Sequence, residues 1–99
     1  MENSKLKEKF LKEIEPKMNN FEIIHKDFKE GDFGSLEQIE FNSENIGGNI
    51  DFWSKGWLGI FLWDYKKEKE ILNTLNEPNE EKDKKENFEK MKEIITTYI

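Results

Sequence analysis

The chain has 99 residues, with 22 acidic and 16 basic side chains, a net charge of −6 and no cysteine. This length holds one domain, residues 1–99, with one modest core built from a hydrophobic content of 34%. The acidic balance argues against a DNA- or RNA-binding module, and the lack of cysteine excludes disulfides, cysteine-based zinc sites and thiol nucleophiles.

No segment is typical of a secretion signal or a membrane span. The first nine residues are mostly polar or charged and contain no apolar stretch. The longest apolar cluster, residues 57–63, is far shorter than the roughly 20 residues needed to cross a bilayer. We therefore expect a cytoplasmic protein.

The first segment has the spacing of an amphipathic helix. Apolar side chains recur at every fourth position, at Leu6, Phe10, Ile14 and Met18. Ser4 is the candidate N-cap. Pro16 would remove a backbone donor from the helix, so we expect the helix to end or kink near residue 15.

Residues 21–28 fit two patterns. Phe21, Ile24 and Phe28 follow a helical period. Phe21, Ile23 and His25 instead alternate as in a strand, and we favour a strand over residues 21–25. A loop with two glycines follows at residues 29–35.

A period of two begins at residue 36 and predicts an antiparallel meander of three strands over residues 36–65. The first two strands, 36–42 and 49–54, are separated by a turn-rich loop that includes Gly47 and Gly48. The third strand, 57–65, is apolar on both faces, and the short connections imply antiparallel pairing. Gly59 inside this strand indicates a bulge or an aromatic ring packed over bare backbone.

Residues 70–75 fit either a short edge strand or a helical turn. Residues 80–98 predict a second amphipathic helix, with apolar positions at Phe88, Met91, Ile94, Ile95 and Tyr98. Pro78 is expected in its first turn, with Glu80 and Glu81 near the positive end of the helix dipole. The expected fold class is α+β: an antiparallel sheet of three to five strands with N-terminal and C-terminal amphipathic helices packed on it.

The excess negative charge is concentrated in the meander and the segment before it. Residues 21–56 contain eight acidic residues and three lysines, a net charge of −5, whereas residues 1–20, 57–77 and 78–99 carry +1, −1 and −1. The two predicted helices are therefore close to neutral mosaics of lysine and glutamate, as is ordinary for surface helices.

Strand alternation divides the meander into two faces. The face expected under the helices carries Ile39, Phe41, Ile50, Phe52, Leu58, Ile60 and Leu62. The opposite face would present Gln38, Glu40, Asn42, Asp51, Trp53, Trp57, Phe61, Trp63 and Tyr65. Such a mixture of carboxylates and aromatic rings suits recognition of a basic protein. The alternative is that a second helix, or residues 21–28, covers these aromatics and makes them part of the core.

We predict a partner-binding surface formed by Glu37, Glu40, Asn42, Glu44, Asp51, Trp53 and Trp57. The sequence offers little for catalysis, because His25 is the sole histidine and the glycine spacing matches neither phosphate-binding nor dinucleotide-binding loops. A calcium-binding loop is also missing from the sequence. We expect no enzymatic activity, no cofactor and no metal.

Residues 34–43 (GSLEQIEFNS) and 47–60 (GGNIDFWSKGWLGI), together with Asp64 and Tyr65, resemble small bacterial immunity proteins. These are the partners of polymorphic toxins, including those of contact-dependent growth inhibition systems. The resemblance rests on the strand-turn-strand pattern. It implies a cytoplasmic inhibitor that binds the toxin's C-terminal effector domain, often a nuclease, and blocks its active site or an adjacent surface.

The local acidity and the resemblance lead to the same hypothesis. A nuclease holds phosphate with lysine and arginine, so an acidic inhibitor would complement its active site. We expect a monomer that neutralises a basic toxin domain in a one-to-one complex, without binding nucleic acid or membrane. The alternatives are a phage-type acidic inhibitor of a host nuclease or defence complex, and a structural domain with no partner site on its sheet.

Overall fold

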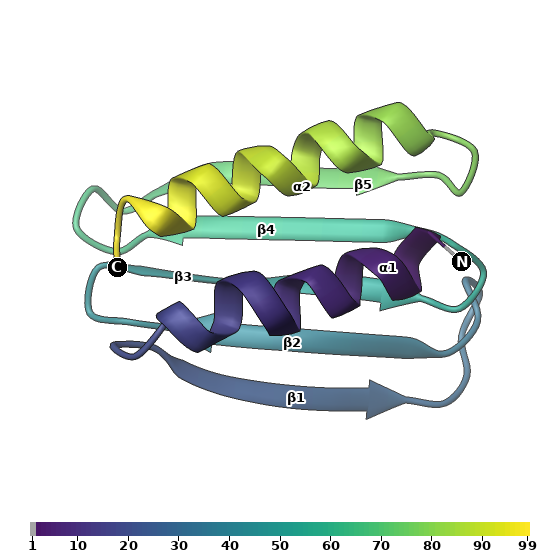
Figure 1. Ribbon diagram of the computed structural model, residues 1–99, viewed down its shortest axis with the longest axis horizontal. Helices are drawn as coiled ribbons and strands as arrows, with labels where there is room; N and C mark the ends of the chain where they lie inside the picture. The colour runs from purple at the N-terminus through teal and green to yellow at the C-terminus, as the bar shows by residue number, and fades with distance from the viewer. Residues whose placement is uncertain (1) are drawn as a thin grey trace.

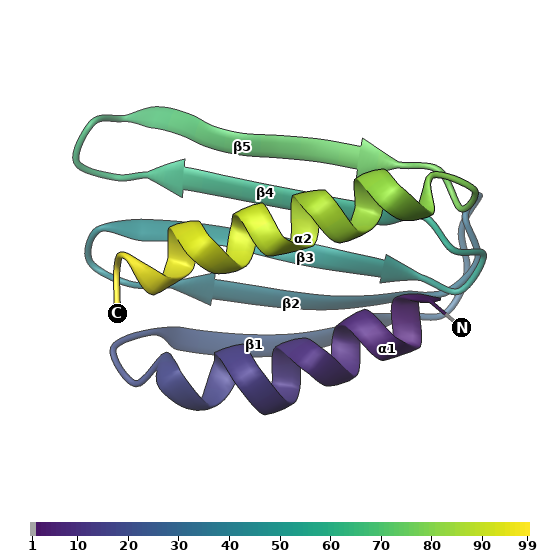
Figure 2. The same ribbon diagram turned by 45° about the horizontal axis from the view of Figure 1, so that its top comes forward.

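A computed structural model describes residues 2–99 as one antiparallel sheet with helices on a single face (Figure 1). The strands are β1 (Glu22–Phe28), β2 (Leu36–Asn42), β3 (Ile46–Trp53), β4 (Leu58–Asp64) and β5 (Lys69–Asn76). Their order in the sheet is the order of the chain, as Figure 2 shows. The expected α+β fold is confirmed, with the central meander extended by one strand at each edge.

The N-terminal helix begins as α1 (Glu2–Lys9) and changes its winding before it ends. It continues as a wider π-helical turn, η1 (Phe10–Ile14), and finishes in a 3₁₀ turn, η2 (Glu15–Lys17), that contains Pro16. The amide of Glu15 donates to the carbonyl of Phe10, five residues back. The expected end or kink near residue 15 is confirmed, whereas Ser4 lies inside α1 and is not its N-cap.

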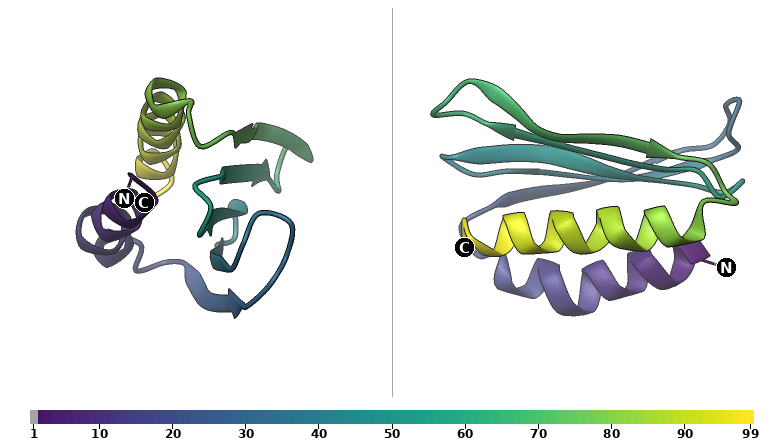
Figure 3. Two further views of the ribbon diagram at one scale, coloured as in Figure 1. Left: turned by 90° about the vertical axis from the view of Figure 1, so that its right-hand side faces the viewer. Right: turned by 90° about the horizontal axis from the view of Figure 1, so that it is seen from above.

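The helix α2 (Glu81–Thr96) lies beside the N-terminal helix on the same face of the sheet (Figure 3). α1 contacts β3, and α2 contacts β4 and β5. Two ion pairs join the helices: Lys9 with Glu89, and Lys92 Nζ with Glu13 Oε1 at 3.2 Å. The alternative in which a helix covers each face of the sheet is therefore wrong.

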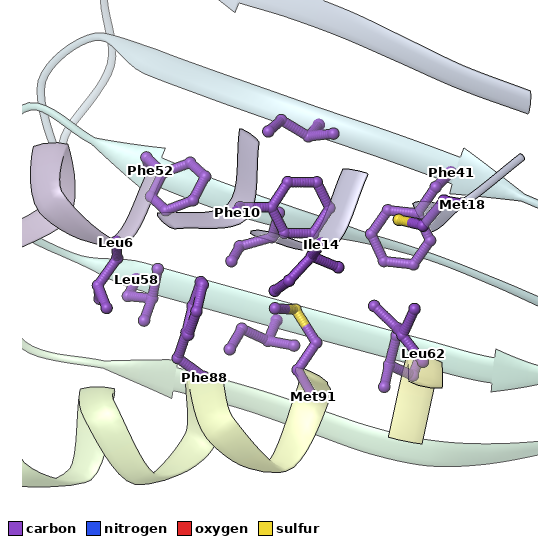
Figure 4. Packing of buried hydrophobic residues seen from close by; sticks show 14 residues of the cluster. Leu6, Phe10, Ile14, Met18, Phe41, Phe52, Leu58, Leu62, Phe88 and Met91 are labelled. Carbon is purple, nitrogen blue, oxygen red and sulfur yellow. The ribbon is translucent and has the colours of Figure 1, made fainter. Parts of the chain in front are cut away.

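The core fills the space between the two helices and this face of the sheet (Figure 4). The helices contribute Leu6, Phe10, Ile14, Phe88, Met91 and Ile95, and Met18 adds to them from just after the N-terminal helix. The sheet contributes Ile39, Phe41, Ile50, Phe52, Leu58, Ile60 and Leu62, which is the set expected from strand alternation. The ring of Phe10 stacks on that of Phe41 with centroids 6.1 Å apart.

Both ambiguous segments are strands. Residues 22–28 pair with β2 along their whole length, so they form an edge of the sheet and do not fold over the aromatic face. Residues 69–76 pair with β4, and the pairing shifts by one residue at Leu62 and Trp63, where Ile71 is the extra residue of a bulge.

Gly47 and Gly48 belong to β3, not to the loop in which the sequence pattern placed them. A side chain at Gly47 would overlap the carboxamide of Asn42 and the hydroxyl of Tyr65. A side chain at Gly48 would overlap the Phe61 carbonyl of the neighbouring strand. Here glycine permits close packing within a strand, which local turn statistics do not reveal.

The α2 helix is also tied to the sheet by a polar contact. It starts at Glu81, slightly later than expected, and Pro78 lies in the preceding turn, close to Gly56. Lys84 is buried, and its Nζ donates to the Gly56 carbonyl at 2.8 Å. This bond connects the helix to the turn between β3 and β4.

Candidate functional site

Within residues 2–99, no helix covers the second face of the sheet, which we call the open face (Figure 3). Its side chains come from alternate positions of all five strands. They are Glu22, Ile24, Lys26, Phe28, Leu36, Gln38, Glu40, Asn42, Asn49, Asp51, Trp53, Phe61, Trp63, Glu70, Asn73 and Leu75, with Gly47 and Gly59 between them. Four carboxylates and one lysine give this face a net charge of −3.

One end of the open face carries a cluster of three rings. Phe33, from the loop between β1 and β2, stacks on Trp57 with centroids 4.0 Å apart and an interplanar angle of 11°. The same ring meets Trp53 edge-on at 5.5 Å and 89°. All three side chains are half-buried, so the rings shield one another only in part.

Backbone hydrogen bonds hold the Phe33 loop in place. The amide of Ser54 donates to the Ser35 carbonyl at 2.8 Å, and the amide of Lys55 donates to the Phe33 carbonyl at 3.2 Å. Gly34 adopts a φ of 89°, in the left-handed region that glycine reaches without strain. The three-ring cluster is therefore an ordered part of the fold.

A second group of aromatics lies at the other end of the open face. Phe61 and Trp63 are half-buried, with their rings stacked at 6.4 Å and 24°. Tyr65 is exposed and donates its hydroxyl to the Asn42 carboxamide. Around these side chains the surface forms a shallow depression of about 310 Å³, also lined by Glu40 and Asn49.

The polar centre of the open face is organised around Asp51. Its Oδ1 accepts hydrogen bonds from Gln38 Nε2 at 2.7 Å and from Asn49 Nδ2 at 3.1 Å. Burial raises the pKa of the Asp51 carboxyl above its ordinary value, and these two hydrogen bonds oppose the rise.

The Trp53 ring lies over Gly59, the residue that faces Asp51 across β3 and β4. A Cβ added at Gly59 would stand 3.1 Å from this ring and 3.4 Å from Asp51 Oδ2. The expectation of an aromatic ring over Gly59 is therefore confirmed, and this glycine places the indole beside the carboxylate.

The structure brings together most of the residues predicted to bind a partner. Glu40, Asn42, Asp51 and Trp53 lie on the open face, and Trp57 joins it through the Phe33 stack. Glu40 Oε2 also lies 3.0 Å from Lys26 Nζ.

The remaining two predicted residues lie elsewhere. Glu44 is exposed in the loop between β2 and β3. Glu37 does not share the open face, because it pairs in register with Phe52 of the helix-covered face and forms an ion pair with Lys7 of α1.

Sequence reasoning missed five apolar residues of this surface: Ile24, Phe28, Phe33, Leu36 and Leu75. Three of them belong to edge strands whose facing depends on their pairing with the central strands. For Phe33, the available signal was an aromatic residue flanked by Gly31 and Gly34 in a loop before a strand. That signal does not identify which side chains the ring contacts.

His25 lies on the helix-covered side of β1, away from the open face. His25 Nε2 lies 2.9 Å from Glu15 Oε1 and links β1 to the end of the N-terminal helix. Across residues 2–99, no group of three or more histidine or acidic side chains is arranged to hold a metal ion. Nor does any helix in this range have the length and apolar character to span a membrane.

Comparison of the chain with protein-family models, curated proteins and solved structures gave no match.

Proposed function

We propose that this protein is a cytoplasmic immunity protein that binds and neutralises a cognate toxin domain with a basic, nuclease-type active site. The open face is the binding surface, and the complex is one-to-one. One observation carries the proposal: a single uncovered sheet face combines four carboxylates with partly exposed aromatic rings.

The apolar exposure on this face supports a protein partner. Ile24, Phe28 and Leu75 are 45%, 48% and 53% exposed, and they lie on the same face as half-buried tryptophans. Contiguous apolar surface rimmed by polar groups is characteristic of protein interaction sites. Aromatic residues are also the side chains that most often dominate binding energy at such sites.

The charge on the open face supports a basic partner. Its four carboxylates are opposed by Lys26 alone, which is already paired with Glu40. Two copies of this face would repel each other, so a second copy of the chain is a poor occupant. A nuclease domain, which gathers lysine and arginine to hold phosphate, has the complementary charge.

The side chains of the open face are held in place by the fold, which supports tight binding. The strands fix most of its side chains in a paired register, and the hydrogen-bonded loop at residues 29–35 fixes Phe33 against Trp53 and Trp57. A surface that is already ordered loses less conformational entropy when it binds. The open face therefore has the negative charge, the exposed apolar area and the ordered structure that suit a basic protein partner.

The test uses the full chain and the toxin domain encoded by the adjoining gene. Titration calorimetry and size exclusion should give a one-to-one complex, and adding the chain should abolish the domain's nuclease activity. Replacing Glu40→Gln, Asp51→Asn and Trp53→Ala together should weaken the complex by about 30-fold or more, because the loss of even one dominant interface side chain costs about 2 kcal/mol or more.

A matched control removes two charges from the exposed surface of α2, with Glu86→Gln and Glu93→Gln. These changes should leave affinity nearly unchanged. Absence of a complex would contradict the proposed function, and equal loss in both variants would contradict the assignment to the open face. A phage operon in place of an adjoining toxin gene would favour an inhibitor of a host nuclease.

A further inference from the structure

At the centre of the open face lies a carboxylate with one hydrogen-bonded oxygen and one oxygen that accepts no hydrogen bond from residues 2–99. Asp51 lies on β3, the middle strand of the sheet. Both Gln38 and Asn49 donate to Oδ1, at 2.7 and 3.1 Å. Within residues 2–99, no hydrogen bond to Oδ2 is present. The two amides therefore hold the carboxylate in one orientation and leave an acceptor free.

Asp51 differs from the other open-face acids because it combines partial burial with the lack of a cationic partner. Glu40 is half-buried but paired with Lys26 at 3.0 Å, whereas Glu22 and Glu70 are exposed. Asp51 is half-buried, and among the described residues no cationic group lies within ion-pair distance of it. A partly desolvated carboxylate without a cation is unfavourable, and the raised pKa of Asp51 reflects that cost.

An aromatic ring stands beside the free oxygen. Asp51 Oδ2 and the Trp53 ring both approach the space over Gly59, where a Cβ would lie 3.4 and 3.1 Å from them. A planar cation bound to Oδ2 would therefore meet the indole ring as well. Guanidinium suits this pair of groups, because it donates directionally to carboxylates and stacks on aromatic rings, whereas ammonium acts as a point charge.

We propose that Asp51 and Trp53 form a socket for one arginine side chain of the partner. The proposal rests on the proposed function in that the arginine belongs to the toxin domain. Gln38 and Asn49 are positioning residues, which orient the carboxylate. The guanidinium supplies the positive charge that none of residues 2–99 brings within ion-pair distance of Asp51.

The socket is testable without the toxin. The probe is a tetra-arginine peptide added to the isotope-labelled full chain, followed by NMR. The side-chain amide signals of Gln38 and Asn49 and the indole signal of Trp53 should shift together. Tetra-lysine should bind more weakly and shift the same signals less, because an ammonium group lacks the planar set of N–H donors of guanidinium.

Asp51→Asn removes the charge with almost no change in shape, and Glu70→Gln is the matched control that removes one charge from the edge of the same face. Tetra-arginine should bind the Asp51→Asn variant about tenfold more weakly than the Glu70→Gln variant, because a charge-assisted hydrogen bond is lost only in the first. Equal weakening in the two variants, or shifts that avoid Gln38, Asn49 and Trp53, would overturn the socket. Thermal unfolding of each variant establishes that it is folded.

The toxin complex separates this proposal from the proposed function. If the toxin domain binds wild type and Asp51→Asn with equal affinity, the socket is wrong while the immunity function stands. If tetra-arginine binds at Asp51 but no toxin domain forms a complex, the socket stands and the immunity function is wrong.

Discussion

The two faces of the sheet are built from the same strands and differ in almost every other respect. The helix-covered face buries Ile, Leu and Phe side chains at 0–3% exposure. All three tryptophans lie instead at the open face, where they are half-buried. The core is complete without them, because both helices pack on one side. Folding therefore constrains one set of alternate positions and leaves the other set available for recognition.

The largest expected effect contrasts two phenylalanines. Phe41→Ala removes a fully buried ring from the covered face and should cost about 3–5 kcal/mol of unfolding free energy. Phe28→Ala removes a 48% exposed ring from the open face and should cost less than about 1 kcal/mol. Urea unfolding measures both, and similar costs would mean that the open face also supports the fold.

A smaller effect is expected at Asp64, a buried residue at the end of β4. Its Oδ1 accepts hydrogen bonds from the amides of Lys66 and Lys67, both at 2.9 Å, and its Oδ2 accepts one from the Tyr98 hydroxyl at 3.2 Å. Led by the bond from Lys67, these contacts lower the pKa of the Asp64 carboxyl. Asp64→Asn should therefore lower Tm by several degrees at neutral pH.

The pH dependence of this difference has a definite sign. A carboxyl whose pKa is lowered by folding stabilises the protein above its unfolded pKa and loses that contribution as pH falls through the folded value. The gap in Tm between wild type and Asp64→Asn should persist from pH 7 to pH 5 and close below about pH 4. A gap independent of pH would indicate that the charge of Asp64 contributes nothing.

Asp51 should show the opposite sign and a smaller effect. Folding raises its pKa, so the ionised carboxylate destabilises the protein at neutral pH, and the cost disappears as pH falls. Asp51→Asn should leave Tm unchanged or raise it by a few degrees while it weakens partner binding. Calorimetry at pH 7 and pH 4 tests this, and a large loss of stability in the variant would give Asp51 a structural role.

The smallest perturbation leaves the chain intact. Acrylamide should quench the fluorescence of the free protein, because Trp53, Trp57 and Trp63 are each partly exposed. Binding of the toxin domain should protect them. Strong resistance to quenching in the free protein would favour the view that the tryptophans belong to a core.

Much of the open face was predictable because period-two alternation is local. Glu40 between Ile39 and Phe41, and Asp51 between Ile50 and Phe52, identify both faces of β2 and β3. The same alternation could not show that both helices share one face, since that arrangement depends on contacts between distant segments. Nor could it show that Glu37 pairs with Lys7, which lies 30 residues earlier in the chain.

The strand order has a kinetic consequence. Every strand pairs with its neighbour in sequence, so the sheet can assemble from successive hairpins. The entropic cost of closing each short loop is small. The core, in contrast, can be completed only late in synthesis. Its residues Phe88, Met91 and Ile95 belong to α2, which follows all five strands in the sequence. During synthesis the part of the covered face that α2 packs on, at β4 and β5, would stay exposed to solvent until α2 docks. The transition state for folding should therefore contain the central hairpins, with α2 contributing late.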